Sequence, residues 1–306
     1  MKTALLIALA IFTIGYLIIW FAAGRTASKN HGVAEGQSTD RTTNRTTLAE
    51  LIIGFVSNFF DTLGIGSFAT TSSMFKLFKI VPDGLIPGTL NVGHTLPTVV
   101  QACIFISIIK VDGRTLACLI AASVAGAWIG AGIVSKWPQH KVRIGLGLCL
   151  IGAAALMLAS QLNLFPIGSD AEGLTGAKLV VGTIGNFILG ALMTLGIGLY
   201  APCMILVSFL GMSPRAAFPI MMGSCAFLMP VGSAQFLRTR RYQRNASIGL
   251  ALGGIPAVLL AAFLVKSLPL SAIRWLVVVV VLYTAAMMLR SAYLDRNTVP
   301  APQPDV

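Results

Sequence analysis

Thr-Leu-Gly-Ile-Gly at residues 62–66 is the stretch that decides the fold, because the chain repeats it at residues 194–198. A five-residue match alone could be chance in a chain rich in glycine and leucine. The same separation, however, also carries Phe55 onto Phe187, Ala69 onto Ala201, Pro82 onto Pro214 and Pro87 onto Pro219. Spaced prolines at one offset indicate an internal duplication, so the two halves are expected to share one architecture.

The composition is typical of an integral membrane protein. Hydrophobic residues make up 56% of the chain and charged residues 10%, and the mean hydropathy is +0.85. Soluble domains carry about 25% charged residues, and the apolar runs are long enough for transmembrane helices. The short alternating strands of a β-barrel are not seen. The formal charge of +12 lies mainly in short loops between apolar runs, where Lys and Arg report topology and not nucleic-acid binding.

The apolar runs predict six parts. Residues 1–23 are expected to form an N-terminal transmembrane helix, since this run is longer than the apolar core of a signal peptide, which is the alternative. Residues 24–47 are a polar cytoplasmic connector, 161–176 an extracytoplasmic linker and 293–306 a cytoplasmic tail. Repeat 1 spans 48–160 and repeat 2 spans 177–292. Each repeat holds four apolar segments, which are Leu48–Phe78, Leu85–Ile109, Thr115–Val134 and Ile144–Ala159, then Lys178–Gly211, Ala216–Phe236, Ala246–Val265 and Leu270–Leu289.

Positive charge predicts which side of the membrane each loop faces. The loops around Lys141 and Arg241 are rich in Lys and Arg and are assigned to the cytoplasm, whereas the linker around Asp170 has neither and is assigned outside. Counting helices from these loops makes the first apolar segment of each repeat begin and end on the same side. The N-terminus is then outside and the C-terminus inside.

The first segment of each repeat is therefore expected to be a re-entrant hairpin. Its second arm, Ser67–Lys79 or Leu199–Gly211, has thirteen residues, or about 20 Å of helix against a hydrocarbon core of about 30 Å. The predicted fold is an all-α polytopic membrane protein. It has two inverted-topology repeats, each a re-entrant hairpin plus three transmembrane helices, and one extra N-terminal helix.

The hairpin tips predict an anion site. Each second arm starts at its tip, so unpaired N–H groups and a partial positive charge point into the membrane. Glycines allow close backbone approach and threonines add hydroxyls; the alternative is that the glycines only permit close helix packing. The candidate substrate-binding residues are Thr62, Gly64, Gly66, Ser67, Asn91, His94, Thr194, Gly196, Gly198, Tyr200 and Ser224.

Polar residues within the apolar runs supply further candidates. Asn91, His94 and Gln101 lie three and seven residues apart, hence on one helix face. Asp61 is expected to pair with His94 or to take up a proton, which makes these two the candidates for proton coupling. Their equivalents in repeat 2 are Met193 and Ala226, so the site should be asymmetric. For Gln101 and Gln235, hydrogen bonding between helices is the favoured interpretation.

No metal, cofactor or catalytic residue is expected. The five cysteines all lie in apolar runs without a Cys-x-x-Cys pair, which indicates small buried hydrophobes. Residues 64–67, Gly-Ile-Gly-Ser, have the wrong order for a rhomboid-type protease. Only Asp61 could serve an aspartyl membrane protease, which needs two such residues, and no ATP-binding motif is present. The sequence therefore does not predict an enzyme.

From Leu48 to Leu289, the Leu-Gly-Ile-Gly hairpin repeated after three more helices resembles the TauE/SafE sulfite-exporter family of membrane permeases. The resemblance implies a secondary transporter, by family an exporter, of small sulfur-containing anions such as sulfite or organosulfonates in the bacterial inner membrane. Many members have further glycines where this chain has Ser67-Phe68 and Leu199-Tyr200, so the substrate stays open. An anion channel or a carrier of another small organic anion are the alternatives. The expected partners are the anion and the lipid bilayer, with a homodimer left open and no nucleic acid.

Overall fold

The structure is a computed structural model that describes residues 2–30, 46, 48–82, 85–134, 171–193 and 199–297, with scattered residues between 144 and 162. Within these ranges the chain is helical, without a β-strand beyond one bridged pair, Ala171 and Met212. The helices are α1 (Lys2–Asn30), α2 (Leu48–Thr62), α3 (Ser67–Phe78), α4 (Ile86–Ile108), α5 (Gly113–Val134), α7 (Gly176–Met193), α8 (Tyr200–Phe209), α9 (Pro214–Thr239), α10 (Arg244–Ser267) and α11 (Leu270–Asn297).

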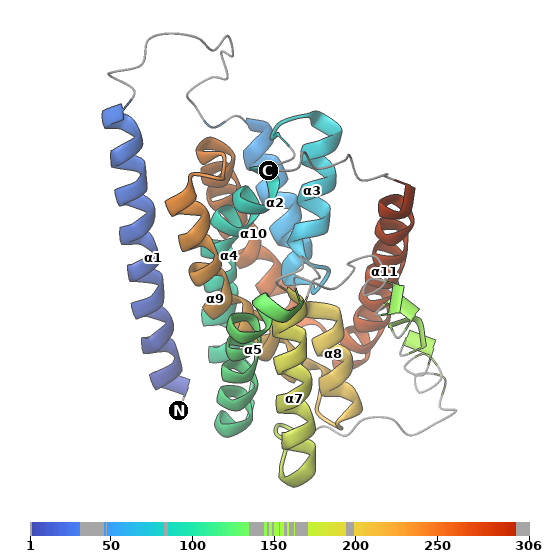
Figure 1. Cartoon of the computed structure of the whole chain (residues 1–306). Helices are drawn as coiled ribbons and strands as arrows, with labels where there is room; N and C mark the ends of the chain where they lie inside the picture. The colour runs from blue at the N-terminus through green and yellow to red at the C-terminus, as the bar shows by residue number, and fades with distance from the viewer. Residues whose placement is uncertain are drawn as a thin grey trace.

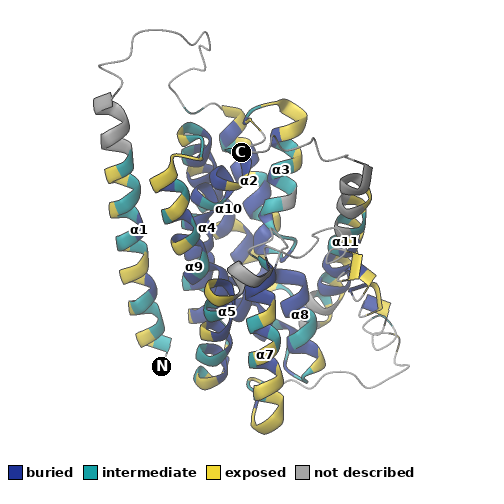
Figure 2. Ribbon diagram, in the orientation of Figure 1, coloured by how far each residue is buried: buried dark blue, intermediate teal, exposed yellow. Residues whose placement is uncertain are grey.

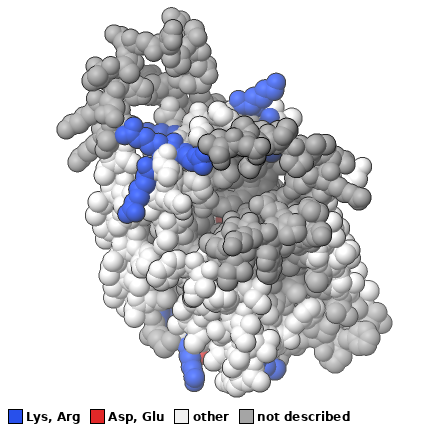
Figure 3. All heavy atoms as spheres, in the orientation of Figure 1, with Lys and Arg blue, Asp and Glu red and all other residues white. Residues whose placement is uncertain are grey.

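The predicted membrane character is confirmed. In the described part of the chain five helices are long and apolar enough to cross a membrane, namely α1 over Lys2–Ala23, α4, α7, α9 and α10. Large apolar side chains such as Ile18 of α1, Ile184 of α7 and Phe263 of α10 are exposed, where lipid would cover them. Buried residues concentrate in the central helices α4, α9 and α10 (Figure 2), and Lys and Arg gather toward the two ends of the face seen in Figure 3. The chain is a multi-pass membrane protein.

Glycine geometry ends α2 and starts α3. Gly64 and Gly66 have φ values of 100° and 88°, a left-handed region that only glycine enters without strain, so the helix cannot continue through them. Both second arms are short, with twelve residues in α3 and ten in α8, or about 18 and 15 Å. In Figure 1, α2 and α3 occupy one end of the molecule and α7 and α8 the other. The second glycine turn, residues 194–198, lies outside the described residues.

Small residues let the principal helix pairs approach closely. The most extensive pairs are α2 with α10, α5 with α7, and α4 with α9. A Cβ on Gly54 of α2 would lie 2.7 Å from the Leu250 backbone of α10, and a Cβ on Gly190 of α7 would collide with the Ser123 carbonyl of α5. Helix packing in lipid depends on such close contacts, because lipid tails are as apolar as the helix surfaces and no hydrophobic force drives the helices together.

We expect Gly190→Leu to separate α5 from α7 and to lower stability by about 3 kcal/mol, because the backbone of Ser123 cannot move aside as a flexible side chain would. Thermal unfolding followed by size-exclusion chromatography in detergent measures this. The matched control is Gly15→Leu in α1, where an added Cβ meets nothing within 4 Å. Equal melting temperatures for the two variants would contradict the packing argument.

Residues 171–174 are hydrogen-bonded to the loops that precede α5 and α9. Asp112 caps α5, since its Oδ2 accepts hydrogen bonds from the backbone N–H and the hydroxyl of Thr115, both at 2.8 Å. The Asp112 N–H donates to the Glu172 carbonyl at 2.8 Å, and the Ser213 N–H donates to the Ala171 carbonyl at 3.0 Å. The bonds from Thr115 lower the pKa of the Asp112 carboxyl below its usual value.

This cap predicts a pH-dependent stability. Because the pKa of Asp112 is lowered on folding, its contribution is present above the unfolded pKa and is lost as pH falls through the folded pKa. Asp112→Ala should therefore lower the free energy of unfolding by about 1 kcal/mol at neutral pH. This difference in stability from the wild type should shrink below about pH 4. Asp112→Asn, which can still cap the helix, should lose less stability. A constant difference between wild type and Asp112→Ala from pH 7 to pH 3 would contradict the assignment.

Candidate functional site

A buried group of polar side chains lies where the α2–α3 turn meets α4 and the first residue of α8. We call it the polar cluster. Most of its members are nearly inaccessible; Asp61, for example, is 2% exposed and Gln101 0%. Buried polar residues in a membrane protein are costly and for that reason mark functional positions. The members are Asn58, Asp61, Thr62, Ser67, Thr71, His94, Gln101 and Tyr200.

Asp61 and Gln101 form the centre of the cluster. Gln101 Nε2 donates to Asp61 Oδ2 and to Thr62 Oγ1, both at 2.9 Å. The Tyr200 hydroxyl is 3.1 Å from Gln101 Oε1 and 3.4 Å from Asp61 Oδ2. The hydroxyl and the backbone N–H of Ser67, the first residue of α3, also face the Asp61 carboxylate and interact favourably with its charge. These partners are all neutral, so the carboxylate is held by dipoles rather than by a cation.

His94 anchors the other end of the cluster. Its Nδ1 lies 3.1 Å from Asn58 Oδ1 and its Nε2 3.0 Å from Thr71 Oγ1. The Asn58 amide nitrogen donates to the Gly54 carbonyl at 2.8 Å, which leaves its oxygen to accept. His94 therefore carries its proton on Nδ1 and accepts from the Thr71 hydroxyl at Nε2.

The expected pairing of Asp61 with His94 is not formed; each group has other partners. His94 faces Asn58, which precedes Asp61 by about one turn of α2. Asp61 itself faces Gln101, two turns further along α4. The two side chains are therefore displaced along the α2–α4 interface by the register of the helices. Whether Asp61 takes up a proton is a separate matter and stays a prediction.

Thr62 is committed to the protein. Its hydroxyl donates to the Asn58 carbonyl at 2.8 Å and accepts from Gln101. Both directions of the hydroxyl are thus used, so Thr62 can reach a ligand only by releasing one of these bonds. Its observed role is to hold the Gln101 amide in place beside Asp61.

The other candidates are distributed over several places. Asn91 lies at the α4–α9 interface, where its amide donates to the Pro87 carbonyl at 3.0 Å. Ser224 accepts from Asn186, whose amide also donates to the Leu119 carbonyl at 2.6 Å, in a second polar group between α5, α7 and α9. Neither is hydrogen-bonded to the polar cluster. Three candidates lie outside the described residues: Thr194, Gly196 and Gly198.

The two described tip glycines differ in their surroundings. A Cβ on Gly64 would lie 2.9 Å from Met204 Cε, which comes from α8, whereas a Cβ on Gly66 would meet nothing within 4 Å. The turn therefore packs against the second hairpin at Gly64 and borders open space at Gly66. That space adjoins the N-terminus of α3.

Sequence reasoning did not find all members of the cluster. The hydrogen bonding between helices that was expected of Gln101 is confirmed, since its amide donates to Asp61 and Thr62 of α2. Thr71 and Asn186 gave no signal, because threonine in a helix usually bonds its own backbone and a single asparagine does not reveal its partner. Only the helix register brings Thr71 to His94.

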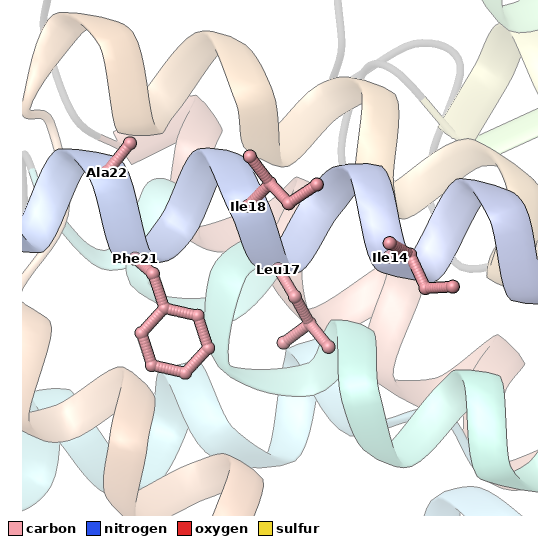
Figure 4. Close-up of a pocket in the computed structure, with 5 residues that line it drawn as sticks. All are labelled: Ile14, Leu17, Ile18, Phe21 and Ala22. Carbon is pink, nitrogen blue, oxygen red and sulfur yellow. The ribbon is translucent and has the colours of Figure 1, made fainter.

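An apolar groove lies apart from the cluster, on α1 (Figure 4). It is lined by Ile14, Leu17, Ile18, Phe21 and Ala22. This lining has neither a charge nor a side-chain hydrogen-bond donor, so it offers nothing to a small anion. The polar cluster is therefore the candidate site.

Comparison with known proteins identifies the family. A family model described as "Sulfite exporter TauE/SafE" matches residues 1–157 and 178–305. Comparisons with curated proteins and with solved structures gave no match. The family match is wider than the resemblance over Leu48 to Leu289, since it includes the first helix and the polar connector. It spans nearly the whole chain, and the chain belongs to the sulfite exporter TauE/SafE family, a family of membrane transporters.

Proposed function

We propose that the protein is a secondary transporter of small sulfur-containing anions such as sulfite or organosulfonates, working as an exporter in a bacterial inner membrane. The substrate binds beside the polar cluster, between the two hairpin turns, and is exposed to one side at a time. The observation that carries this proposal is that Asp61, before the first turn, faces both Ser67 at the start of α3 and the Tyr200 hydroxyl, 3.4 Å away, at the start of α8. The beginnings of both second arms therefore converge on one buried point.

The packing supports an inverted repeat with re-entrant hairpins. Under the duplication α2 corresponds to α7, α5 to α10, and α4 to α9. The pairs α2 with α10 and α7 with α5 are then the same contact with the repeats exchanged, and α4 with α9 is a contact between equivalents. The second arms α3 and α8 are about 18 and 15 Å long and lie at opposite ends of the molecule in Figure 1, and each is too short to cross a core of about 30 Å. This is the architecture of alternating-access carriers.

Neutral donors around the cluster support a small anion as substrate. A helix N-terminus offers N–H groups and a partial positive charge, and the space beside Gly66 adjoins the N-terminus of α3. No Lys or Arg of the described residues is buried. An anion held by neutral donors alone loses hydration for a moderate gain only, so it can also be released. Such a balance suits a transporter better than a tight binding protein.

Sulfite flux into proteoliposomes tests the function. We expect protein-dependent sulfite uptake that is accelerated by unlabelled sulfite inside the vesicles, because a carrier returns faster when loaded. Uptake without such acceleration would favour a channel that uses the same site. If sulfite, thiosulfate and methanesulfonate all show no binding and no flux, the proposal is contradicted.

Proton coupling gives a more specific prediction. Asp61→Asn and His94→Gln should each abolish sulfite accumulation driven by a pH gradient, while anion binding is retained, since neither substitution removes Ser67 or Tyr200. The control is Gln235→Leu, at an exposed position of α9. Accumulation that depends on the gradient equally in all three variants would assign Asp61 and His94 a purely structural role.

A further inference from the structure

We propose that Asp61 is an internal anion that competes with the substrate for the same donors, so that substrate anion and proton bind together and cross the membrane in the same direction. The inference rests on the proposed anion transport and concerns how the same site is loaded. In this structure the Asp61 carboxylate faces Ser67 at the N-terminus of α3, beside the position expected for the substrate.

The donors that hold Asp61 are those an anion would need. Gln101 Nε2 donates to it at 2.9 Å, and the Tyr200 hydroxyl lies 3.4 Å from the same oxygen. Ser67 supplies both a hydroxyl and a backbone N–H. These donors come from α4, α8 and α3, so the Asp61 carboxylate lies where three helices meet and interacts with all three. An incoming anion can share this junction only if some of the donors turn away from Asp61.

Among the described residues, none with a positive charge faces Asp61 to let two anions coexist. The titratable groups that face Asp61 are the Tyr200 phenol of α8 and the Cys225 thiol of α9. His94 of α4 is one turn away and bonds Asn58 and Thr71. Two negative charges at one buried point repel strongly. A protonated Asp61 removes that repulsion and, as a carboxylic acid, contributes a donor of its own.

The binding step is balanced without any further reactant. One proton from the solution joins the Asp61 carboxylate, one anion enters beside Gly66, and the donors of Ser67 and Tyr200 transfer from the carboxylate to the anion. Release on the other side reverses both events. The cargo is then one anion plus one proton per cycle. A proton gradient directed inward therefore favours uptake, and export depends on the anion gradient and, for a doubly charged anion whose cargo keeps one negative charge, on the membrane potential.

Proton counting by calorimetry tests the inference. Sulfite binding to the purified full-length protein is measured in two buffers with different ionisation enthalpies, for the wild type and for Asp61→Asn. The wild type should take up about one proton more per bound sulfite than the variant, because the protons that sulfite itself exchanges cancel in the comparison. Asp61→Asn should bind sulfite at least as tightly. The sulfite affinity of the wild type should in addition fall by up to about tenfold per pH unit at high pH.

The outcomes separate this inference from the proposed function. Equal proton uptake by the two proteins, or loss of sulfite binding in Asp61→Asn, overturns the inference while sulfite transport by the wild type still stands. If Asp61→Asn does not yield folded protein, sulfite's own titration is measured in the same buffers and subtracted from the wild-type count. A remainder near one at the upper end of the pH range supports the inference, and a remainder of zero throughout overturns it. Absence of sulfite binding and flux in the wild type contradicts both.

Discussion

Replacing Gln101 with leucine is expected to abolish transport and to lower stability by about 3 kcal/mol. The amide serves three partners at once: it donates to Asp61 and Thr62 and accepts from Tyr200. Leucine has a similar volume, so the loss comes from the partners, which stay buried without their hydrogen bonds. An unsatisfied buried polar group costs about 1–3 kcal/mol, and a charged one more. Thermal unfolding and sulfite flux per folded protein measure the two effects.

Two further variants isolate the network from general damage. Gln235→Leu makes the same substitution at an exposed position of α9 and should change neither quantity. Asp61→Leu combined with Gln101→Leu removes the charge together with its principal donor, so it should recover part of the lost stability while transport stays absent. If the double variant loses more stability than the two single variants lose in total, the assignment of Gln101 as the partner of Asp61 is contradicted.

The hairpin could be predicted from the sequence because its cause is local. Glycine is the residue that adopts positive φ without strain, and the observed values at Gly64 and Gly66 end the helix where the repeated motif predicted a turn. The apolar exterior was likewise predictable, since composition alone determines which surface lipid must cover. These features depend on a few consecutive residues or on the average of many.

The partners within the cluster could not be predicted, because they depend on how helices are placed against each other. Spacing along α4 showed that His94 and Gln101 share a face, but it did not say which residue of α2 each would meet. The register places Asn58 at His94 and Asp61 at Gln101. Asn91 shares that spacing, yet its amide bonds its own helix at the α4–α9 interface. One turn of difference in register thus separated two residues that were expected to pair.

Valine at Gly66 is expected to abolish transport and to leave the fold largely intact, whereas valine at Gly64 should damage both. The two positions share positive φ values of 88° and 100°, and Gly66 with its ψ of 132° lies outside the αL region, so any other residue adds strain of about 1–3 kcal/mol at either. They differ in space: a Cβ on Gly64 would lie 2.9 Å from Met204 Cε, and one on Gly66 would meet nothing within 4 Å. Bulk at Gly66 therefore enters the space that we assign to the substrate.

An alanine–valine series at each position separates strain from bulk. Alanine introduces the backbone strain with the least volume, so Gly66→Ala should melt below the wild type and keep part of its sulfite flux. The step from alanine to valine at Gly66 should then remove the remaining flux, since the added methyl groups enter open space. At Gly64 alanine should add a small loss to the backbone strain, because its Cβ meets only the flexible end of the Met204 side chain, and the bulkier valine should lose more. Flux that survives valine at Gly66 at the level of alanine would mean that the anion does not pass this turn, and the binding site would have to be sought elsewhere in the bundle.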